Sequence, residues 1–358
     1  MSGRVFQIME ALDHGDGVSD MVRAFVPVLT KHGVERAILT LHAHDAVRAE
    51  TLPFESVTWR PGDAVIVHVW NYTNMETFLR TFPGRKAIYF NNITPPDFFE
   101  PGTAAHTATR AGWDQLPHLV ELADMWLAPS AYNLAAVRAV GRAPHRERVI
   151  PPLIDAHEEQ TRPVNAPLLE ILRARGEVNI LFVGRLAPNK FQERVMAVFD
   201  YYHSRINRRS RLHLVGNASG NPGYAEQLEM FRTRLASGDA IELPGKVNDL
   251  DLQAYYHAAD LFLCLSEHEG FGLPPLIAAA HGVPVLARAA AALPETLGRA
   301  AVLLHDYDPA RIAELMHVIL QEEPLRERLR AAAGRNLSRF RADAVERAWG
   351  LALADLRR

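Results

Sequence analysis

The stretch Ser266-Glu267-His268-Glu269-Gly270-Phe271-Gly272-Leu273-Pro274-Pro275 follows the apolar run 261–265 and precedes the helix-like run 276–281. This order predicts a buried strand, a glycine loop that contains a carboxylate, and the start of a helix. Glycines let the main chain approach a ligand closely, and the amide groups at a helix N-terminus favour negative charge. The loop is therefore expected to hold the phosphates of a ligand. Glu269 is expected to accept hydrogen bonds from the hydroxyl groups of an attached sugar.

Strand-like and helix-like segments alternate on both sides of this loop, which predicts parallel sheets with helices on both faces. The predicted strands are 5–9, 36–41, 64–69, 86–90, 125–128, 180–183, 212–215, 240–243, 261–265 and 283–287. The predicted helices are 18–30, 103–123, 131–140, 193–205, 224–235, 250–259 and 274–280, and the chain from 309 onward is helical in character.

A length of 358 residues favours two domains. The proline-rich segment 151–167 is the candidate linker. The expected fold class is α/β, with two facing, doubly wound Rossmann-like domains and a ligand at the carboxyl ends of their strands. The expected bounds are 1–165, 166–335 and a C-terminal helix over 336–358, for which packing back on the first domain is one option.

The composition excludes several classes of protein. A net charge of −3 gives no reason to expect nucleic acid. The single cysteine, Cys264, lies in an apolar run and is expected to be a buried, inert thiol in a reducing compartment. The sequence contains neither a signal-peptide core nor a long apolar run, so a cytoplasmic location is expected.

Two basic clusters leave a peripheral contact with the inner membrane face open as an alternative. We prefer solvated helix ends for both clusters. Their members are Arg205, Arg208, Arg209 and Arg211, and Arg142, His145, Arg146 and Arg148.

The turn after predicted strand 180–183 carries two cations, Arg185 and Lys190, next to Gly184. Guanidinium and ammonium groups at the carboxyl end of a parallel strand suit phosphate oxygens. Two solvated surface cations are the alternative. Val247 ends another predicted strand of this half, where either a contact with a planar base or an ordinary turn fits equally well.

In the first half, Gly15, Asp16 and Gly17 join a predicted strand to a helix. The glycines would admit a substrate closely, and Asp16 would either bind a hydroxyl group or cap the helix, with equal weight. His68 and the pair Asn91-Asn92 follow or end two further strands, where amide and imidazole groups suit a sugar. His68 alone is more often a satisfied structural histidine.

Other chemistries have no support in the sequence. It lacks a Gly-x-Gly-x-x-Gly motif after the first strand, a nucleotide-triphosphatase phosphate loop, a hydrolase Gly-x-Ser-x-Gly motif, a His-Glu-x-x-His motif and paired cysteines. We therefore expect no cofactor and no metal site.

Together these motifs resemble the retaining GT-B glycosyltransferases of family 4. The resemblance spans nearly the whole chain and is strongest over 180–284, through Val183-Gly184-Arg185, Asn189-Lys190, the loop from Glu269 to Pro274, and Gly282-Val283-Pro284-Val285. The first half resembles a subgroup of bacterial polysaccharide assembly. The segments that carry this likeness are Gly15-Asp16-Gly17-Val18-Ser19-Asp20 and Asn92-Ile93-Thr94-Pro95-Pro96-Asp97-Phe98-Phe99.

The resemblance implies roles for the residues. Arg185 and Lys190 would bind the donor diphosphate and stabilise the leaving group, and Glu269 would contact the donor sugar. The donor-binding set would be Gly184, Val247, Ser266, Gly270, Phe271, Gly272, Leu273 and Ile277. The acceptor and sugar side would comprise Gly15, Asp16, Gly17, His68, Asn91 and Asn92.

Two positions depart from the family pattern. Ile277 stands where the family has a second glutamate that holds the ribose, and an aliphatic side chain accepts no hydrogen bond. Asn91 stands where the family often has a histidine, and an amide does not titrate near neutral pH.

The expected function is transfer of a sugar from a nucleotide-diphosphate sugar to a glycan, lipid-linked glycan or small-molecule acceptor, with GDP-mannose favoured as donor and UDP-sugars next. We expect that no metal is required, because the cations Arg185 and Lys190 can replace one. The alternatives are a catalytically weakened GT-B subunit that binds a partner, and a GT-B sugar-nucleotide epimerase or phosphorylase.

Overall fold

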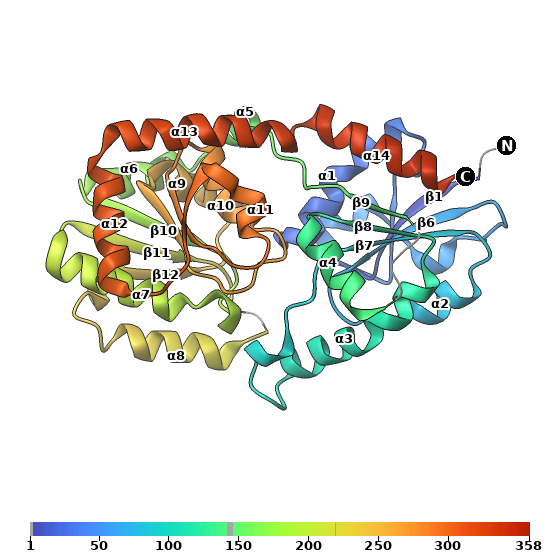
Figure 1. Cartoon of the computed structure of the whole chain (residues 1–358), viewed down its shortest axis with the longest axis horizontal. Helices are drawn as coiled ribbons and strands as arrows, with labels where there is room; N and C mark the ends of the chain where they lie inside the picture. Colours follow the sequence, from blue (N-terminus) through green and yellow to red (C-terminus); the bar gives the residue numbers. More distant parts are fainter. Residues whose placement is uncertain (1–2, 142–145, 219) are drawn as a thin grey trace. The chain divides into compact units, whose positions relative to one another are not determined.

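The computed structural model describes residues 3–141, 146–218 and 220–358. The chain divides into two compact units (Figure 1). Unit 1 comprises the chain up to Ile154 together with Arg339–Arg358, and unit 2 comprises Asp155–Ser338. The division therefore falls within the predicted linker, but before residue 165, where the sequence placed the domain boundary.

Unit 1 contains a seven-stranded parallel sheet with the strand order β5-β3-β1-β6-β7-β8-β9. Its strands are β1 (Val5–Met9), β3 (Ile38–Thr40), β5 (Thr51–Pro53), β6 (Ala64–Val69), β7 (Arg85–Phe90), β8 (Met125–Ala128) and β9 (Glu147–Val149). Two short strands, β2 (Ala11–Leu12) and β4 (His42–Ala43), pair separately. Its helices are α1 (Gly17–Lys31), α2 (Glu76–Thr81), α3 (Ala104–Leu122), α4 (Ala131–Val140) and α14 (Ala342–Leu356).

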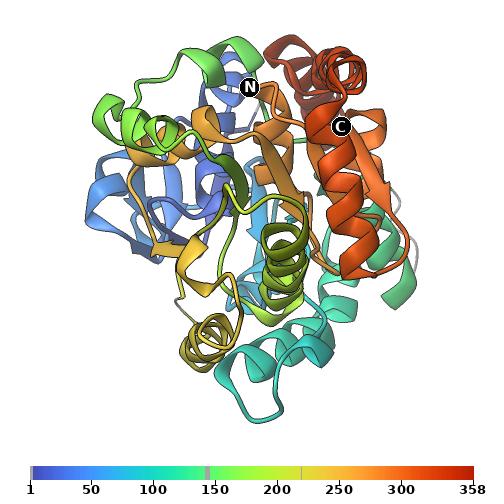
Figure 2. The same ribbon diagram turned by 90° about the vertical axis from the view of Figure 1, so that its left-hand side faces the viewer.

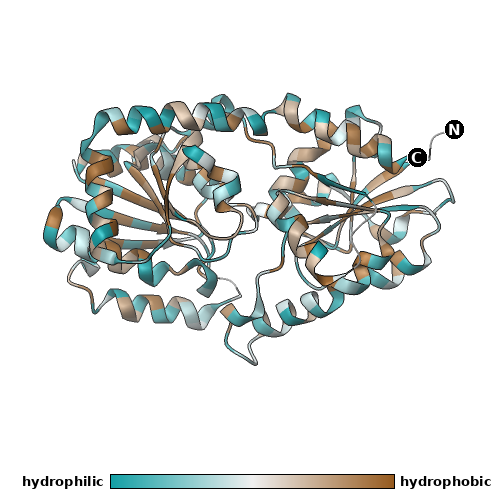
Figure 3. Ribbon diagram, viewed as in Figure 1, coloured by the Kyte–Doolittle hydropathy of each residue, from teal (hydrophilic) through white to brown (hydrophobic). Residues whose placement is uncertain are grey.

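Helices cover both faces of this sheet. Apolar residues of α1 and α14 pack on one face, and those of α2, α3 and α4 pack on the other. The C-terminal helix belongs to unit 1 because Trp349 is fully buried there, with its ring centroid 5.1 Å from that of Phe25 on α1. The strands consist mainly of apolar residues, as the brown ribbons of Figure 3 show.

Unit 2 contains a six-stranded parallel sheet with the order β12-β11-β10-β13-β14-β15 (Figures 1 and 2). Its strands are β10 (Val178–Val183), β11 (Ser210–Val215), β12 (Ile241–Gly245), β13 (Leu261–Cys264), β14 (Val285–Arg288) and β15 (Ala301–Leu304). Its helices are α5 (Ala156–Thr161), α6 (Ala166–Ala174), α7 (Gln192–Tyr201), α8 (Pro222–Arg232), α9 (Asp249–Ala258), α10 (Leu273–Ala280), α11 (Leu293–Leu297), α12 (Pro309–Gln321) and α13 (Glu323–Leu337). Each sheet thus has the parallel, helix-covered architecture that the alternation predicts.

The predicted linker over 151–167 is not structureless. Helix α5 occupies its centre, because the Asp155 side chain caps the helix by accepting hydrogen bonds from the main-chain N–H groups of His157 and Glu158. Proline content alone therefore overstated the length of the connection.

The basic cluster of unit 2 is partly neutralised within that unit. Arg211 pairs with Glu177 at 2.6 Å and with Glu242 at 3.2 Å. In the second cluster, Arg148 pairs with Asp355, whereas residues 142 and 145 lie outside the described residues. Among the helices that the structure describes, none combines the length and apolar character needed to cross a membrane.

Candidate active site

Two loops of unit 2 meet at the carboxyl edge of its sheet, because they follow the adjacent strands β10 and β13. The main-chain N–H groups of Glu267 and His268 donate to the carbonyl oxygen of Asn189, at 3.1 and 3.4 Å. The buried Asn189 side chain donates in return to the carbonyl oxygen of His268 at 2.9 Å. Asn189 therefore joins the turn that carries Lys190 to the loop that carries Glu269.

Lys190 and Glu269 form the central ion pair of this edge. The distance from Lys190 Nζ to Glu269 Oε2 is 2.5 Å, and only 14% and 10% of the two side chains are exposed. A pair with so little water around it interacts more strongly than a surface pair. The ammonium group has further N–H donors for an anion, and the second carboxylate oxygen can accept hydrogen bonds from hydroxyl groups.

The glycine loop adopts a conformation that depends on glycine at one position. Gly272 has a φ of +90° and precedes α10, and a Cβ atom there would lie 2.5 Å from Leu293 Cδ2. Pro274 and Pro275 supply no N–H groups to the first turn of α10. The amide donors at this edge are therefore mainly those of the loop, and the N–H groups of Gly270 and Gly272 donate to no acceptor in the described part of the chain.

Arg185 is exposed beyond the end of β10, and its guanidinium group forms no ion pair with any described residue. Its main chain is fixed by the fully buried Gln192, whose Nε2 donates to the Arg185 carbonyl oxygen at 2.8 Å. The preceding residue packs against Gly216, where a Cβ atom would lie 1.9 Å from the Gly184 carbonyl oxygen. Gln192 and Gly216 were not predicted from the sequence, although Gly216 directly follows strand β11 as Gly184 directly follows β10.

The remaining donor-side candidates differ in accessibility. Ser266 is fully buried, and its hydroxyl oxygen lies 3.4 Å from the Sγ atom of Cys264. Burial raises the pKa of Cys264 to about 11, which fits an inert thiol. The partly exposed residues are Val247 after β12, Phe271 in the glycine loop, and Leu273 and Ile277 on α10.

His268 lies between the two glutamates of this loop and was not predicted. Burial lowers its pKa to about 4, and the neighbouring Lys190 ammonium lowers it further in the same direction. The imidazole is therefore neutral near pH 7 and adds no positive charge to the edge.

The candidates in unit 1 make hydrogen bonds within their own unit. Asp16 caps α1, because its Oδ2 atom accepts from both the N–H and the hydroxyl group of Ser19, each at 3.1 Å. Of the two roles left open for Asp16, the structure shows the cap. Gly15, with a φ of +70°, and Gly17 are exposed beside it.

His68 and Asn92 are part of the interior of unit 1. His68 Nε2 lies 3.1 Å from Gln7 Oε1, and burial lowers the pKa of His68 to about 3. Asn92, with a φ of +76°, is buried and donates to Asn133 Oδ1 on α4 at 2.7 Å. Asn91 is partly exposed and donates to the Tyr89 carbonyl oxygen at 3.4 Å. The structure therefore places His68 and Asn92 in the scaffold of the unit.

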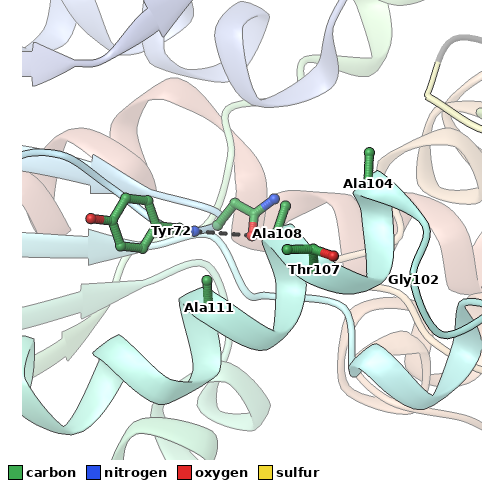
Figure 4. A pocket seen from close by; sticks show the side chains of 7 residues that line it. Tyr72, Gly102, Ala104, Thr107, Ala108 and Ala111 are labelled. Atoms are coloured by element: carbon green, nitrogen blue, oxygen red, sulfur yellow. Dashed lines mark hydrogen bonds between the residues drawn. The ribbon is translucent and has the colours of Figure 1, made fainter.

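A shallow depression of about 610 Å³ lies next to the loop after β6 (Figure 4). Tyr72 is 49% exposed at its rim. The adjacent Thr73 is fixed by Gln115, whose side chain accepts from the Thr73 N–H and donates to its carbonyl oxygen, at 2.9 and 2.8 Å. The other lining residues are Asn71, Gly102, Ala104, Thr107, Ala108 and Ala111. Unit 1 thus offers a flat aromatic ring on an anchored loop.

Among the described residues, no group of three or more His, Cys, Asp and Glu side chains is arranged to hold a metal ion.

Comparisons with known proteins agree with the geometry of unit 2. Residues 170–336 match the family Glycosyl transferases group 1. The D-inositol 3-phosphate glycosyltransferase of Geodermatophilus obscurus is 31% identical over 206 residues, which cover 56% of this chain and 45% of that protein. The enzyme of the same name from Streptomyces coelicolor is 32% identical over 172 residues, which cover 46% of this chain and 37% of that protein. The chain thus spans less than half the length of these two relatives.

Solved structures match nearly the whole chain. The Anabaena protein HepE in complex with UDP-glucose superposes with a TM-score of 0.74 and 17% identity, covering 97% of this chain and 99% of that one. The sucrose-phosphate synthase of Thermosynechococcus elongatus gives a TM-score of 0.76 and 17% identity, covering 99% of both chains. At this level of identity the likeness establishes the fold. The chain therefore has the GT-B fold, and its residues 170–336 are similar in sequence to the glycosyl transferases group 1 family.

Proposed function

We propose that this chain transfers a sugar from a nucleotide-diphosphate sugar to a hydroxyl group of an acceptor, with retention of anomeric configuration. The observation that carries the proposal is the Lys190–Glu269 pair, held at one sheet edge beside the exposed Arg185. Two cations and one carboxylate at that edge match a ligand that combines phosphates with sugar hydroxyl groups.

The favoured donor is a UDP-sugar. GDP-mannose was the donor favoured from the sequence, but the similar proteins lend that donor no support. HepE was solved with UDP and with UDP-glucose, and the fold of this chain is the same. The curated relatives are named for D-inositol 3-phosphate, so an inositol phosphate joins glycans and lipid-linked glycans as an acceptor to be tested.

The proposed chemistry uses the charges at this edge. As the bond between the anomeric carbon and the β-phosphate oxygen breaks, negative charge gathers on the departing diphosphate, where Arg185 and Lys190 stabilise it. The acceptor oxygen bonds to the same carbon, and its proton passes to the leaving phosphate. Glu269 accepts hydrogen bonds from donor-sugar hydroxyl groups. In this scheme the two side-chain cations neutralise the charge of the diphosphate, as a metal ion would.

A second candidate is a GT-B subunit that binds nucleotide but does not turn it over. Ile277 favours it, because this partly exposed aliphatic side chain on α10 accepts no hydrogen bond from a ribose. This candidate predicts nucleotide binding without product.

The test combines binding with turnover. Thermal unfolding is followed with UDP, GDP, ADP and dTDP, and release of the free nucleotide is followed with UDP-glucose and GDP-mannose in the presence of the acceptor panel. A ligand at about 100 times its Kd adds roughly 2.7 kcal/mol of stability. We expect UDP to stabilise the chain, and Arg185→Ala to abolish the effect.

The outcomes separate the candidates. Turnover of UDP-glucose supports the transferase, and product that forms without an acceptor and retains the nucleotide indicates an epimerase instead. Stabilisation by UDP without turnover of any donor favours the binding subunit. If no nucleotide stabilises the chain, the proposed site is wrong.

A further inference from the structure

We propose that Glu267 is a positioning residue for the Lys190–Glu269 pair, acting through Arg194 and Arg288. The inference rests on the proposed function and adds to it a second layer of side chains behind the charges that would meet the donor. Glu267, Arg194 and Arg288 are called the arginine clamp below.

The arginine clamp joins three elements of unit 2. Glu267 Oε1 accepts from Arg194 Nη1 on α7 at 2.6 Å and from Arg288 Nε on β14 at 3.1 Å. Arg288 also donates to the carbonyl oxygens of Leu304, at 3.4 Å, and His305. One carboxylate thus ties the loop after β13 to the helix that follows β10 and to the strand next in the sheet.

The arginine clamp reaches Lys190 through the next residue in the chain. Phe191 has a φ of +50°, a left-handed conformation that is strained for a bulky side chain. The guanidinium carbon of Arg194 lies 3.8 Å from the centre of the Phe191 ring, within the range of a cation–π contact. Because Arg194 is held in turn by Glu267, the conformation of the turn that presents Lys190 depends on that carboxylate.

The arginine clamp reaches Glu269 from the other side. The Glu269 carbonyl oxygen accepts from the N–H group of Ala292 at 3.4 Å. Ala291, in the same turn, is again a non-glycine residue with a φ of +50°. This turn starts directly after Arg288, so the clamp fixes one end of each strained turn. Strained main chain that is held by its surroundings is common at functional sites.

A purely structural ion pair is the competing explanation, and the molecule contains a matched control. Arg211 and Glu177 lie 2.6 Å apart with 24% and 22% of their side chains exposed, and Arg194 and Glu267 lie 2.6 Å apart with 28% and 24% exposed. Glu177 precedes β10, at the end of the strand opposite to Lys190. Partly exposed pairs of this kind contribute little to stability, so equal stability effects and unequal catalytic effects would identify a positioning role.

The test compares Glu267→Gln with Glu177→Gln in the full chain. Melting temperature, Kd for UDP, Kd for UDP-glucose, and kcat and KM for UDP-glucose turnover are measured for both variants. We expect similar shifts of melting temperature. Glu177→Gln should leave kcat within twofold of the wild type, whereas Glu267→Gln should lower kcat at least tenfold and weaken UDP-glucose binding more than UDP binding.

A double-mutant cycle tests the route through Arg194. Arg194→Ala alone should lower kcat, but in the Glu267→Gln background the same change should add less than a threefold effect, because both residues act through one contact. Arg194→Lys keeps the charge but loses the planar stack on Phe191. It should give an intermediate kcat, and it provides a milder variant if Glu267→Gln folds poorly.

Each outcome decides the proposal. If Glu267→Gln matches Glu177→Gln in kcat and in both Kd values, the clamp is an ordinary ion pair and the inference is overturned, while the proposed function stands. If the fold-changes in kcat of Arg194→Ala and Glu267→Gln multiply in the double variant, Arg194 does not act through Glu267. If the wild type binds neither UDP nor UDP-glucose, the proposed function fails first and the inference fails with it.

Discussion

The carboxyl edges of the two sheets use their polar residues differently. In unit 2, Lys190 and Glu269 face each other and Arg185 is exposed, so their charged groups can meet a ligand. In unit 1, Asp16 and His68 are bound by partners of their own unit. Both edges follow parallel strands, and both carry the residue types of a sugar site.

The difference lies in which side chains hold the loops. In unit 2, the buried amides of Asn189 and Gln192 hydrogen-bond the main chain of the loops, and the charged side chains of Lys190 and Glu269 pair with each other. In unit 1, the predicted site residues are themselves bound within the scaffold: Asp16 accepts from the main-chain N–H group of Ser19, and Asn92 donates to the side chain of Asn133 on α4. A polar side chain at a strand end is therefore available to a ligand only when another group makes the hydrogen bonds that the surrounding main chain needs.

Substitution of Lys190 should have the largest effect and tests directly whether the charged pair of unit 2 is functional. Lys190→Ala removes a cation that we propose stabilises the leaving group, and losing one such donor lowers kcat by about 10²–10³-fold. It also leaves the mostly buried Glu269 carboxylate without its partner, which costs roughly 3–5 kcal/mol of stability. Nucleotide release assays and urea unfolding measure the two effects.

The double variant Lys190→Met with Glu269→Leu is the control for this substitution. Replacing both partners by apolar side chains of similar size should recover most of the stability but none of the activity. Recovery of activity in this variant would show that the pair belongs to the scaffold, like the polar residues of unit 1.

Substitution of Gly216 tests the scaffold beneath Arg185. The added Cβ atom of Gly216→Ala would lie 1.9 Å from the Gly184 carbonyl oxygen, so the turn before Arg185 has to move. Overpacking of this kind costs about 1–3 kcal/mol, and we expect the Kd for UDP to rise at least tenfold. Gly223→Ala is the matched control, because a Cβ atom there meets nothing within 4 Å. Equal affinities of the two variants would contradict the prediction.

Much of the fold could be predicted from the sequence, because buried parallel strands are apolar runs. Four elements, β1, β6, β8 and α4, have the predicted bounds. The strands β5, β9 and β15 were missed because they are short edge strands of three or four residues, and Glu147–Val149 begins with two charged residues. These segments are strands because they hydrogen-bond to an adjacent strand of the sheet, and the local amino-acid pattern does not reveal that pairing.

The charged residues of the candidate site could be predicted from the sequence, but the buried residues that hold their loops in place could not. Arg185, Lys190 and Glu269 stand out because charge after an apolar run is unusual. Gln192 was not recognised, because a glutamine at a helix start looks like any surface residue until its contact with the Arg185 carbonyl oxygen is seen. For His68 the sequence left two roles open, a sugar contact and a structural histidine, and its contact with Gln7 supports the structural one.

Substitution of Asn92 tests whether this residue of unit 1 belongs to the scaffold. Asn92→Ala removes the hydrogen bond to Asn133 and leaves that buried amide unpaired, which costs about 1–3 kcal/mol. We expect urea unfolding to show this loss, while kcat for UDP-glucose at 20 °C changes less than threefold. A large fall in kcat without a loss of stability would instead return Asn92 to the sugar site.

The pH dependence of stability provides the last test, which concerns His68. Burial lowers its pKa from an ordinary value near 6.5 to about 3, so below pH 6.5 the unfolded chain takes up a proton that the folded chain does not. Stability therefore falls as the pH drops from 6.5 towards 3, by at most about 1.4 kcal/mol per pH unit for this residue. His68→Gln should reduce the slope of unfolding free energy between pH 6.5 and 4.5. A slope remains, because His268 and His281 also have pKa values lowered to about 4. If His68→Gln keeps the full slope but loses turnover, the imidazole is accessible and unit 1 contributes it to catalysis after all.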